Sequence, residues 1–272
     1  MTIMICLTAV LAVLLAVYLL LLMPRMGHPG WEQFSSVRYA HRGLHDEENG
    51  IPENSLAAFR RAVEHGFGAE LDVHLLRDGS LAVFHDSNLK RICGADITIE
   101  TLSAEEVKQY SLLGTGETIP MLQEVLTVFE GKTPLIIELK VVDNNAAALT
   151  DAVMAMLQGW NGTYCIESFH PGVVAHLKKL YPHVIRGQLS ENFLKNKHIN
   201  RFVAFSMTFL LTTGLTKPDF IAFAHQDRSC ISLRLMRHLY GVHEVGWTIR
   251  DQAVMEQLEK DGVTPIFENF IP

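Results

Sequence analysis

The sequence is poor in cysteine and has no run of basic residues. Its four cysteines contain no Cys-x-x-Cys pair, and the three that follow the apolar N-terminal run show no framework spacing: Cys93, Cys165 and Cys230. Neither a disulfide framework nor a structural zinc site is indicated. The net charge is −7, and aromatic and basic residues are not interleaved, so nucleic acid is not an expected partner. An anionic substrate has to be held by a local site, because the field of the whole chain repels it.

The first 24 residues contain no charged side chain. As a helix, Ile3 to Met23 rises about 31 Å, which is enough to cross a bilayer core. A cleaved signal peptide is the rival interpretation, but the apolar run is too long, no basic segment precedes it and no small-residue cleavage site follows. We expect a single-pass membrane anchor over 1–24 and a linker over 25–36. Arg25 and Arg38 follow the span, which favours a cytoplasmic location for the rest of the chain.

The remaining residues, 37–272, suit one large α/β domain. Short β-rich runs alternate with segments of helical period, and eight such alternations predict a (β/α)₈ TIM barrel. One expected helix has Asn54 or Ser55 as its N-cap and stops at Gly66. The expected strands are Val37–His41, Ala69–Val73, Leu135–Lys140, Tyr164–Phe169, Val184–Leu189, Phe220–Ala224, Glu244–Ile249 and Thr264–Phe267.

A ninth run, Leu81–His85, does not fit this alternation. It follows the second expected strand after "RDGS", and Asp-Gly is a strong two-residue turn signal, so we expect a small inserted hairpin there. With Asp78 and Gly79 as the turn residues, Asp72 faces His85 across the hairpin. Glu70 lies two residues before Asp72 and therefore on the same strand face.

Charged residues stand at the ends of the other expected strands. His41 and Arg42 end the first, and "PLIIELK" places Glu138 and Lys140 on one face of a buried strand. Burying these charges unpaired costs about several kcal/mol, and a bound cation, or a substrate anion for the lysine, would offset that cost. The carboxylates Glu70, Asp72 and Glu138 suit a hard divalent cation more than zinc, because the set contains no thiolate or imidazole.

The histidines and the basic residues complete this expected site. His41 and His85 form a candidate proton-transfer pair, since imidazoles titrate near neutral pH. Arg42 and Lys140 are candidates for binding phosphate. Together with the carboxylates they indicate phosphoryl-ester chemistry.

The sequence contains the segments "AHRG", "PENSLAAFRRAVEHG", "ELDVHLLRDGSLAVFHD", "IPMLQEVL" and "IELK", followed by "ESFHP" and "VGWTIR". In the first five it resembles the glycerophosphodiester phosphodiesterase family, and in the last two the resemblance is weaker. It implies a TIM barrel with a small insertion near its second strand, and metal-dependent hydrolysis of glycerophosphodiesters to glycerol 3-phosphate and an alcohol. It implies Mg²⁺ or Ca²⁺ as the ion. The implied roles are catalysis for His41 and His85, metal binding for Glu70, Asp72 and Glu138, and phosphate binding for Arg42 and Lys140.

Three further residues are candidates. Trp247 is expected to lie partly in the core and partly in the wall of the substrate pocket. Glu53 and Asn54 belong either to the helix start or to the surroundings of the metal and substrate. Two departures from the family pattern, Leu76 and the C-terminal "FENFIP", lie outside the metal set and are expected to affect substrate preference more than catalysis.

Other functions remain open from the sequence. The same fold and ion would serve a lysophospholipase D acting on lysophospholipids, and the membrane anchor makes that class of substrate accessible. A non-catalytic, anchored phospholipid-binding module is disfavoured because every expected ligand and both histidines are present. A different metal-dependent barrel, such as an aldolase, is disfavoured by the two histidines beside three carboxylates. The sequence leaves the head group, the ion and the oligomeric state open.

Overall fold

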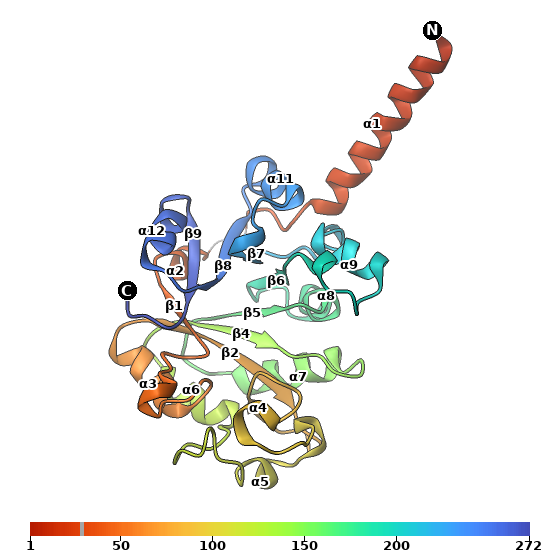
Figure 1. The fold of residues 1–272 in the computed structure, drawn as a ribbon. Helices are drawn as coiled ribbons and strands as arrows, with labels where there is room; N and C mark the ends of the chain where they lie inside the picture. Colours follow the sequence, from red (N-terminus) through yellow and green to blue (C-terminus); the bar gives the residue numbers. More distant parts are fainter. Residues whose placement is uncertain (28–29) are drawn as a thin grey trace.

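Eight parallel strands close into a barrel in the computed structural model, which describes residues 1–27 and 30–272 (Figure 1). Neighbouring strands follow the order β1-β9-β8-β7-β6-β5-β4-β2, and β1 also pairs with β2, so the sheet has no open edge within the barrel. The predicted (β/α)₈ barrel is confirmed. The barrel strands are β1 (Tyr39–His41), β2 (Gly68–Leu75), β4 (Leu135–Leu139), β5 (Tyr164–Ser168), β6 (Arg186–Ser190), β7 (Phe220–Ala224), β8 (His243–Ile249) and β9 (Val263–Phe267).

Amphipathic helices cover the outside of the barrel. In α3 (Leu56–Glu64), the Ser55 side chain accepts a hydrogen bond from the amide of Ala58, and Gly66 follows the helix with φ of 73°. Ser55 is therefore the N-cap, and Asn54 is not. The other covering helices are α6 (Leu122–Phe129), α7 (Ala146–Leu157), α8 (Pro171–Leu180), α9 (Arg201–Thr208), α10 (Thr213–Thr216), α11 (Ile231–Tyr240) and α12 (Gln252–Lys260).

The inside of the barrel is packed with apolar side chains, among them Tyr39 and Phe220. The short helix α2 (Glu32–Ser35) contributes Phe34, and the ring of the preceding Trp31 packs at a tilt against Phe220, with ring centroids 5.0 Å apart. The expected linker over 25–36 is thus packed against the barrel from residue 30 onward, because its aromatic residues gain burial there. Residues 28 and 29 of that linker lie outside the described residues.

The expected hairpin is present, but its predicted register is wrong. Strand β3 (Leu81–Val83) runs antiparallel to β2, with Val83 opposite Val73. The Leu76 amide donates to the Ser80 carbonyl, so three residues form the loop, and its last residue, Gly79, has φ of 84°. This extra loop residue shifts the pairing by one position and places Asp72 opposite Phe84 rather than His85.

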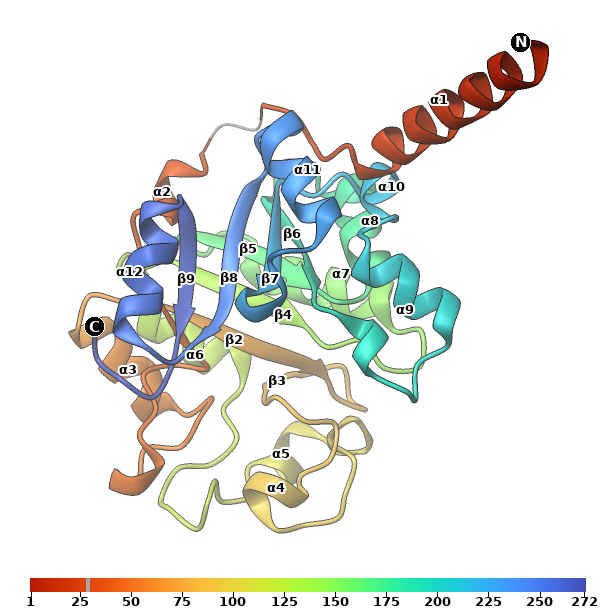
Figure 2. The same cartoon turned by 45° about the horizontal axis from the view of Figure 1, so that its top comes forward.

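The segment after β3 is a small insertion with an apolar core of its own (Figure 2). It contains α4 (Lys90–Cys93) and α5 (Ala104–Val107), and α6 then leads back to the barrel at β4. Phe84, Leu89 and Ile99 are buried in its core. The insertion therefore forms a flank with its own packed core beside the end of β2.

The N-terminal helix α1 (Thr2–Leu22) projects away from the barrel (Figures 1 and 2). Its span Ile3–Leu22 has a mean hydropathy of 3.0 and only 6% of it is buried. By length and composition it could be a membrane anchor or a signal sequence. Its last turn is docked, since the Tyr240 hydroxyl donates to the Leu19 carbonyl and Thr213 Oγ1 donates to the Leu21 carbonyl.

Candidate active site

The carboxyl ends of the barrel strands surround a cavity of about 310 Å³. Parallel strands deliver their last side chains to the same end of a barrel, which explains why residues far apart in sequence meet there. Seven of the ten residues expected in the site line this cavity: His41, Arg42, Glu70, His85, Glu138, Lys140 and Trp247. Of the other three, Glu53 contacts Arg42, Asp72 contacts Lys140, and Asn54 contacts Asp72.

Three buried carboxylates form the centre of the site. Glu70 and Asp72 come from β2 and Glu138 from β4, and one oxygen of each lies within 4.8 Å of the others. Burial raises the pKa of Glu138 to about 7, although Lys140 opposes that rise. Burial, reinforced by the neighbouring carboxylates, also raises the pKa of Glu70 well above its usual value. A divalent cation would offset the repulsion among these buried carboxylates, so the cluster could hold one.

Two cationic side chains neutralise part of this cluster. Lys140 Nζ lies 2.9 Å from both Asp72 Oδ1 and Glu138 Oε1. Arg42 donates its backbone amide to Glu70 over 3.1 Å, and its Nε lies 3.5 Å from Asp72 Oδ2. Burial alone would raise the pKa of Asp72, but Lys140 and the other nearby cations hold it well below its usual value. The Asp72 carboxylate is therefore ionised, with a cation on each side.

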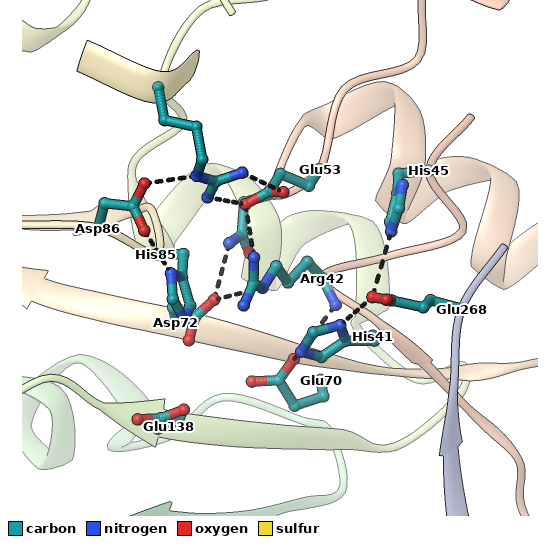
Figure 3. A network of polar contacts seen from close by, with 12 residues as sticks. His41, Arg42, His45, Glu53, Glu70, Asp72, His85, Asp86, Glu138 and Glu268 are labelled. Atoms are coloured by element: carbon teal, nitrogen blue, oxygen red, sulfur yellow. Dashed lines mark hydrogen bonds and ion pairs between the residues drawn. The ribbon is translucent and has the colours of Figure 1, made fainter. Parts of the chain in front are cut away.

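Each of the two expected catalytic histidines is held by a carboxylate (Figure 3). His41 Nδ1 donates to Glu268, at the end of β9, and His85 Nδ1 donates to Asp86 Oδ1 over 2.6 Å. Since a carboxylate only accepts, both neutral rings carry their proton on Nδ1 and leave Nε2 as an acceptor. His41 Nε2 lies 3.9 Å from Glu70 Oε2, so that nitrogen faces the carboxylate cluster.

Burial lowers the pKa of both histidines. In His41 the hydrogen bond to Glu268 opposes this effect without overcoming it, and in His85 the charge of Asp72 does the same. Burial would raise the pKa of Glu268, but its hydrogen bond to His41 and other neighbours keep it far below the ordinary value. Burial thus favours the neutral form of both imidazoles, while the ionised carboxylate beside each ring favours its protonated form.

A polar network links the two histidines to the carboxylate cluster. Asn54 donates from Nδ2 to Asp72 Oδ2 over 2.9 Å, with φ of 52° at Asn54. Glu53 accepts from Arg42 over 2.8 Å and from Arg91 over 2.7 and 2.9 Å. Asn54 therefore orients a carboxylate of the cluster instead of capping the helix, and Glu53 fixes the guanidinium of Arg42.

Sequence reasoning missed the partners of the histidines. Glu268 lies in "FENFIP", a departure expected to affect substrate preference more than catalysis, yet it contacts His41. Asp86 directly follows His85, and Arg91, on α4, donates to Asp86 Oδ2 over 2.6 Å. The position of Asp86 directly after His85 was a signal that its carboxylate could contact that histidine. Nothing in the sequence paired Glu268 with His41, because only barrel closure brings β9 beside β1.

Two further side chains shape the cavity wall. Trp247, at the end of β8, is half-buried and packs edge-on against Phe169, with ring centroids 5.7 Å apart. Glu167, on β5, pairs in register with Glu138, and burial raises its pKa well above the usual value. Among the described residues its Oε2 has no hydrogen-bond partner. Burial thus favours the protonated form of Glu167 at the edge of the carboxylate cluster.

A family model of the glycerophosphoryl diester phosphodiesterase family matches residues 41–272. Among curated proteins, a glycerophosphodiester phosphodiesterase of Caldanaerobacter subterraneus subsp. tengcongensis is 34% identical over 160 residues, 55% of this chain and 65% of that protein. One of Bacillus altitudinis is 31% identical over 54% of this chain and 63% of that protein. The lysophospholipase D GDPD1 of Homo sapiens is 36% identical over 47% of this chain and 44% of that protein. The matches thus span less than two thirds of these relatives.

Solved structures share the fold. The phosphodiesterase of Oleispira antarctica, solved in complex with the product sn-glycerol-3-phosphate, superposes with a TM-score of 0.68 and 24% identity, over 85% of this chain and 92% of that one. The glycerophosphodiester phosphodiesterase of Thermotoga maritima gives a TM-score of 0.65 and 23% identity, over 85% and 94%.

Proposed function

The chain belongs to the glycerophosphoryl diester phosphodiesterase family, and we propose that it hydrolyses glycerophosphodiesters to glycerol 3-phosphate and an alcohol. One observation supports this most: a buried cluster of three carboxylates shares a cavity with two histidines whose Nδ1 atoms are held by carboxylates. A phosphodiester needs a cation for its charge, a base for the attacking hydroxyl and an acid for the leaving alcohol, and this arrangement provides for all three.

In this proposal, Glu70, Asp72 and Glu138 bind the cation, Mg²⁺ or Ca²⁺. The three donors fit such an ion, since all are carboxylate oxygens within 4.8 Å of one another. When bound, the ion supplies positive charge to the phosphoryl oxygens. Arg42 and Lys140, already held at the rim of the cluster, orient the phosphate through charge-assisted hydrogen bonds.

His41 and His85 carry the proton transfers. One imidazole Nε2 takes the proton of a glycerol hydroxyl as its oxygen bonds to phosphorus. The other, protonated, gives its proton to the departing alcohol as the second phosphorus–oxygen bond breaks. Water then opens the cyclic phosphate, with the proton transfers reversed. Glu268 and Asp86 stabilise whichever ring is charged, and Trp247 forms the wall against which the substrate packs.

We further propose that α1 is a retained single-pass anchor over residues 1–24, with the catalytic domain on the cytoplasmic side. The docked last turn supports retention, because its carbonyls accept hydrogen bonds from Thr213, Lys217 and Tyr240 of the domain. Arg25 and Arg38 after the span support the orientation. The packing of Phe34 in the barrel supports a folded domain that starts before residue 37.

The test is release of glycerol 3-phosphate from glycerophosphocholine by the detergent-solubilised full chain, with Mg²⁺, with Ca²⁺ and with EDTA. Metal-dependent release that is lost in His41→Ala and in His85→Ala is expected, whereas His183→Ala, a change at an exposed histidine, leaves the rate unaltered. Release that survives either catalytic substitution would overturn the assigned pair. A second candidate, lysophospholipase D activity, is favoured by one observation, an apolar cavity beside the site.

A further inference from the structure

The base of α1 is built into the folded domain. Leu22 is fully buried in an apolar cluster that includes Phe223 of β7 and Met236 of α11. One helical turn earlier, the Tyr18 hydroxyl shares a hydrogen bond of 2.8 Å with Oγ of Ser232 on α11. Figure 2 shows α10 and α11 beside this end of the helix. The end of α1 therefore cannot leave the domain without exposing a core residue.

This docking leaves α1 short for a bilayer. Its free part, residues 2–17, rises about 24 Å, whereas the hydrocarbon core of a membrane is about 30 Å thick. A helix that spans the bilayer must therefore use its docked residues, 18–22, as well. The domain surface that holds these residues is thereby brought into the headgroup region on that side of the membrane.

Exposed apolar side chains surround the base of α1. Ile231 directly precedes Ser232, which bonds to Tyr18. Leu239 directly precedes Tyr240, whose hydroxyl donates to a carbonyl of α1. Leu215 lies on α10, the short helix that contacts α1. These three residues, which we call the helix-base patch, are each between 51% and 69% exposed. Large apolar side chains that stay in water at one place indicate a site for an apolar partner or a membrane.

Basic residues lie beside the helix-base patch. Lys178 Nζ donates to the Leu215 carbonyl over 2.7 Å, and Lys178 and Lys179 are both exposed near the end of α8. Residues 170–240, which contain α8 to α11, have ten lysines and arginines against three aspartates and glutamates, in a chain whose net charge is −7. Basic residues beside a membrane span favour contact with anionic lipid headgroups. The charge of this side therefore favours a lipid surface as its partner.

We propose that the helix-base patch is a membrane-docking surface of the catalytic domain. Its apolar side chains enter the headgroup region of the bilayer that holds α1, and Lys178 and Lys179 contact anionic lipid headgroups. The inference rests on the anchor proposed above for α1 and is independent of the phosphodiesterase chemistry. Because α1 is fixed to the domain at its base, the membrane meets the domain in one orientation.

Fluorescence quenching in lipid nanodiscs tests this contact. The full chain is reconstituted in phosphatidylcholine brominated either near the headgroup or near the bilayer centre, as wild type and with Leu215→Trp or Leu239→Trp. The native tryptophans are common to all samples, so the difference from wild type reports the new one. We expect it to be quenched, and more strongly by the shallow bromines. The matched control, Val254→Trp on α12, is an exposed position on a helix away from α1, and neither lipid should quench it.

The other outcomes of this experiment overturn the proposal. Emission from the patch at short wavelength without bromine quenching would show that protein, such as a second copy of the chain, covers it. Emission at long wavelength without quenching would show that the patch stays in water. Leu11→Trp, in the middle of α1, separates the proposals. If deep bromines quench it while the patch is not quenched, the docking surface alone is wrong, and if they do not, the anchor is wrong too. Loss of phosphodiesterase activity in these samples would leave the docking result standing.

Lipid preference tests the basic residues. The association of spin-labelled phosphatidylserine with the full chain is compared with that of spin-labelled phosphatidylcholine. We expect the preference for phosphatidylserine to fall by up to about fivefold for each charge removed by Lys178→Gln and Lys179→Gln. Lys90→Gln, at an exposed lysine of the insertion, serves as the control and should leave the preference unaltered. A preference that is the same in all variants would overturn the contact with anionic headgroups.

Discussion

Glu268 accepts a hydrogen bond from Nδ1 of His41, although the two residues stand 227 positions apart in the sequence. His41 ends β1 and Glu268 directly follows β9, and these two strands pair to close the barrel. The contact fixes the ring of one proposed catalytic histidine with its Nε2 toward the carboxylate cluster. The pairing of β1 with β9 that closes the barrel therefore also brings Glu268 to the ring that it orients.

The first prediction concerns Glu268→Gln. The hydrogen bond to Glu268 raises the pKa of His41 against the lowering effect of burial, so loss of the carboxylate lowers that pKa further. A lower pKa moves the matching limb of the bell-shaped pH profile of kcat/KM to lower pH, and we expect the maximal rate to fall about tenfold or more. A shift of the acidic limb identifies His41 as the base, and a shift of the basic limb identifies it as the acid. Two unmoved limbs would contradict a role for His41 in proton transfer.

The second prediction is the counterpart at His85. Asp86 Oδ1 accepts from His85 Nδ1, and this bond opposes the lowering of the His85 pKa by burial. Asp86→Asn is therefore expected to shift the other limb of the profile, again to lower pH, with a loss in rate of about tenfold. Asp96→Asn, at an exposed carboxylate that pairs with Lys90, serves as the control. If both substitutions move the same limb, the two histidines do not divide the acid and base roles.

The third prediction is that metal binding releases protons. Burial raises the pKa of Glu138 to about 7, so at pH 6 this carboxyl is mostly protonated and a cation must displace the proton. Metal affinity is expected to rise as the pH increases from 5 to 7, by about tenfold per unit for each proton displaced. Calorimetry in two buffers of different ionisation enthalpy measures the release. In Glu138→Gln, the number of protons released on metal binding at pH 6 should fall by the proton that Glu138 carries. An unaltered number would show that Glu138 is already ionised before the metal binds.

The fourth prediction concerns Lys140→Met. The ammonium group lies 2.9 Å from Asp72 and from Glu138, and its removal leaves buried carboxylates facing one another. The metal-free protein should lose about 3 kcal/mol of unfolding free energy, and a divalent cation should restore part of it. Chemical denaturation with EDTA and with Mg²⁺ measures both effects. Lys90→Met, at a surface ion pair, is expected to alter the free energy by less than about 0.5 kcal/mol.

The fifth prediction tests where the folded domain begins. Phe34 is only 1% exposed and belongs to the cluster inside the barrel, so Phe34→Ala should cost about 3 to 5 kcal/mol of unfolding free energy. Phe202→Ala, at a phenylalanine that is 79% exposed, should cost much less. Equal small costs in thermal or chemical unfolding would show that residues 30–36 are not part of the domain core.

Local patterns predicted most of the architecture. The strand Phe220–Ala224 is found as predicted, and the other barrel strands differ from their expected bounds by one or two residues. The hairpin after β2 was predicted, yet its register was not. Asp-Gly signals a turn, but whether the loop has two or three residues depends on the Leu76–Ser80 hydrogen bond, which forms only when β3 docks on β2.

The sequence by itself determined the barrel, the apolar N-terminal helix and the identity of the carboxylates that cluster, because these depend on periodicity and on residues two apart on one strand. Only the tertiary structure decided which groups orient them. The contacts of Glu268 with His41, Asn54 with Asp72 and Arg91 with Glu53 join residues at least 18 positions apart in the sequence. Such pairings are set by barrel closure and by the docking of the insertion, and no local pattern specifies them. The apolar cavity beside the site has the same origin, since its wall joins the end of β4 to a helix some sixty residues later in the chain.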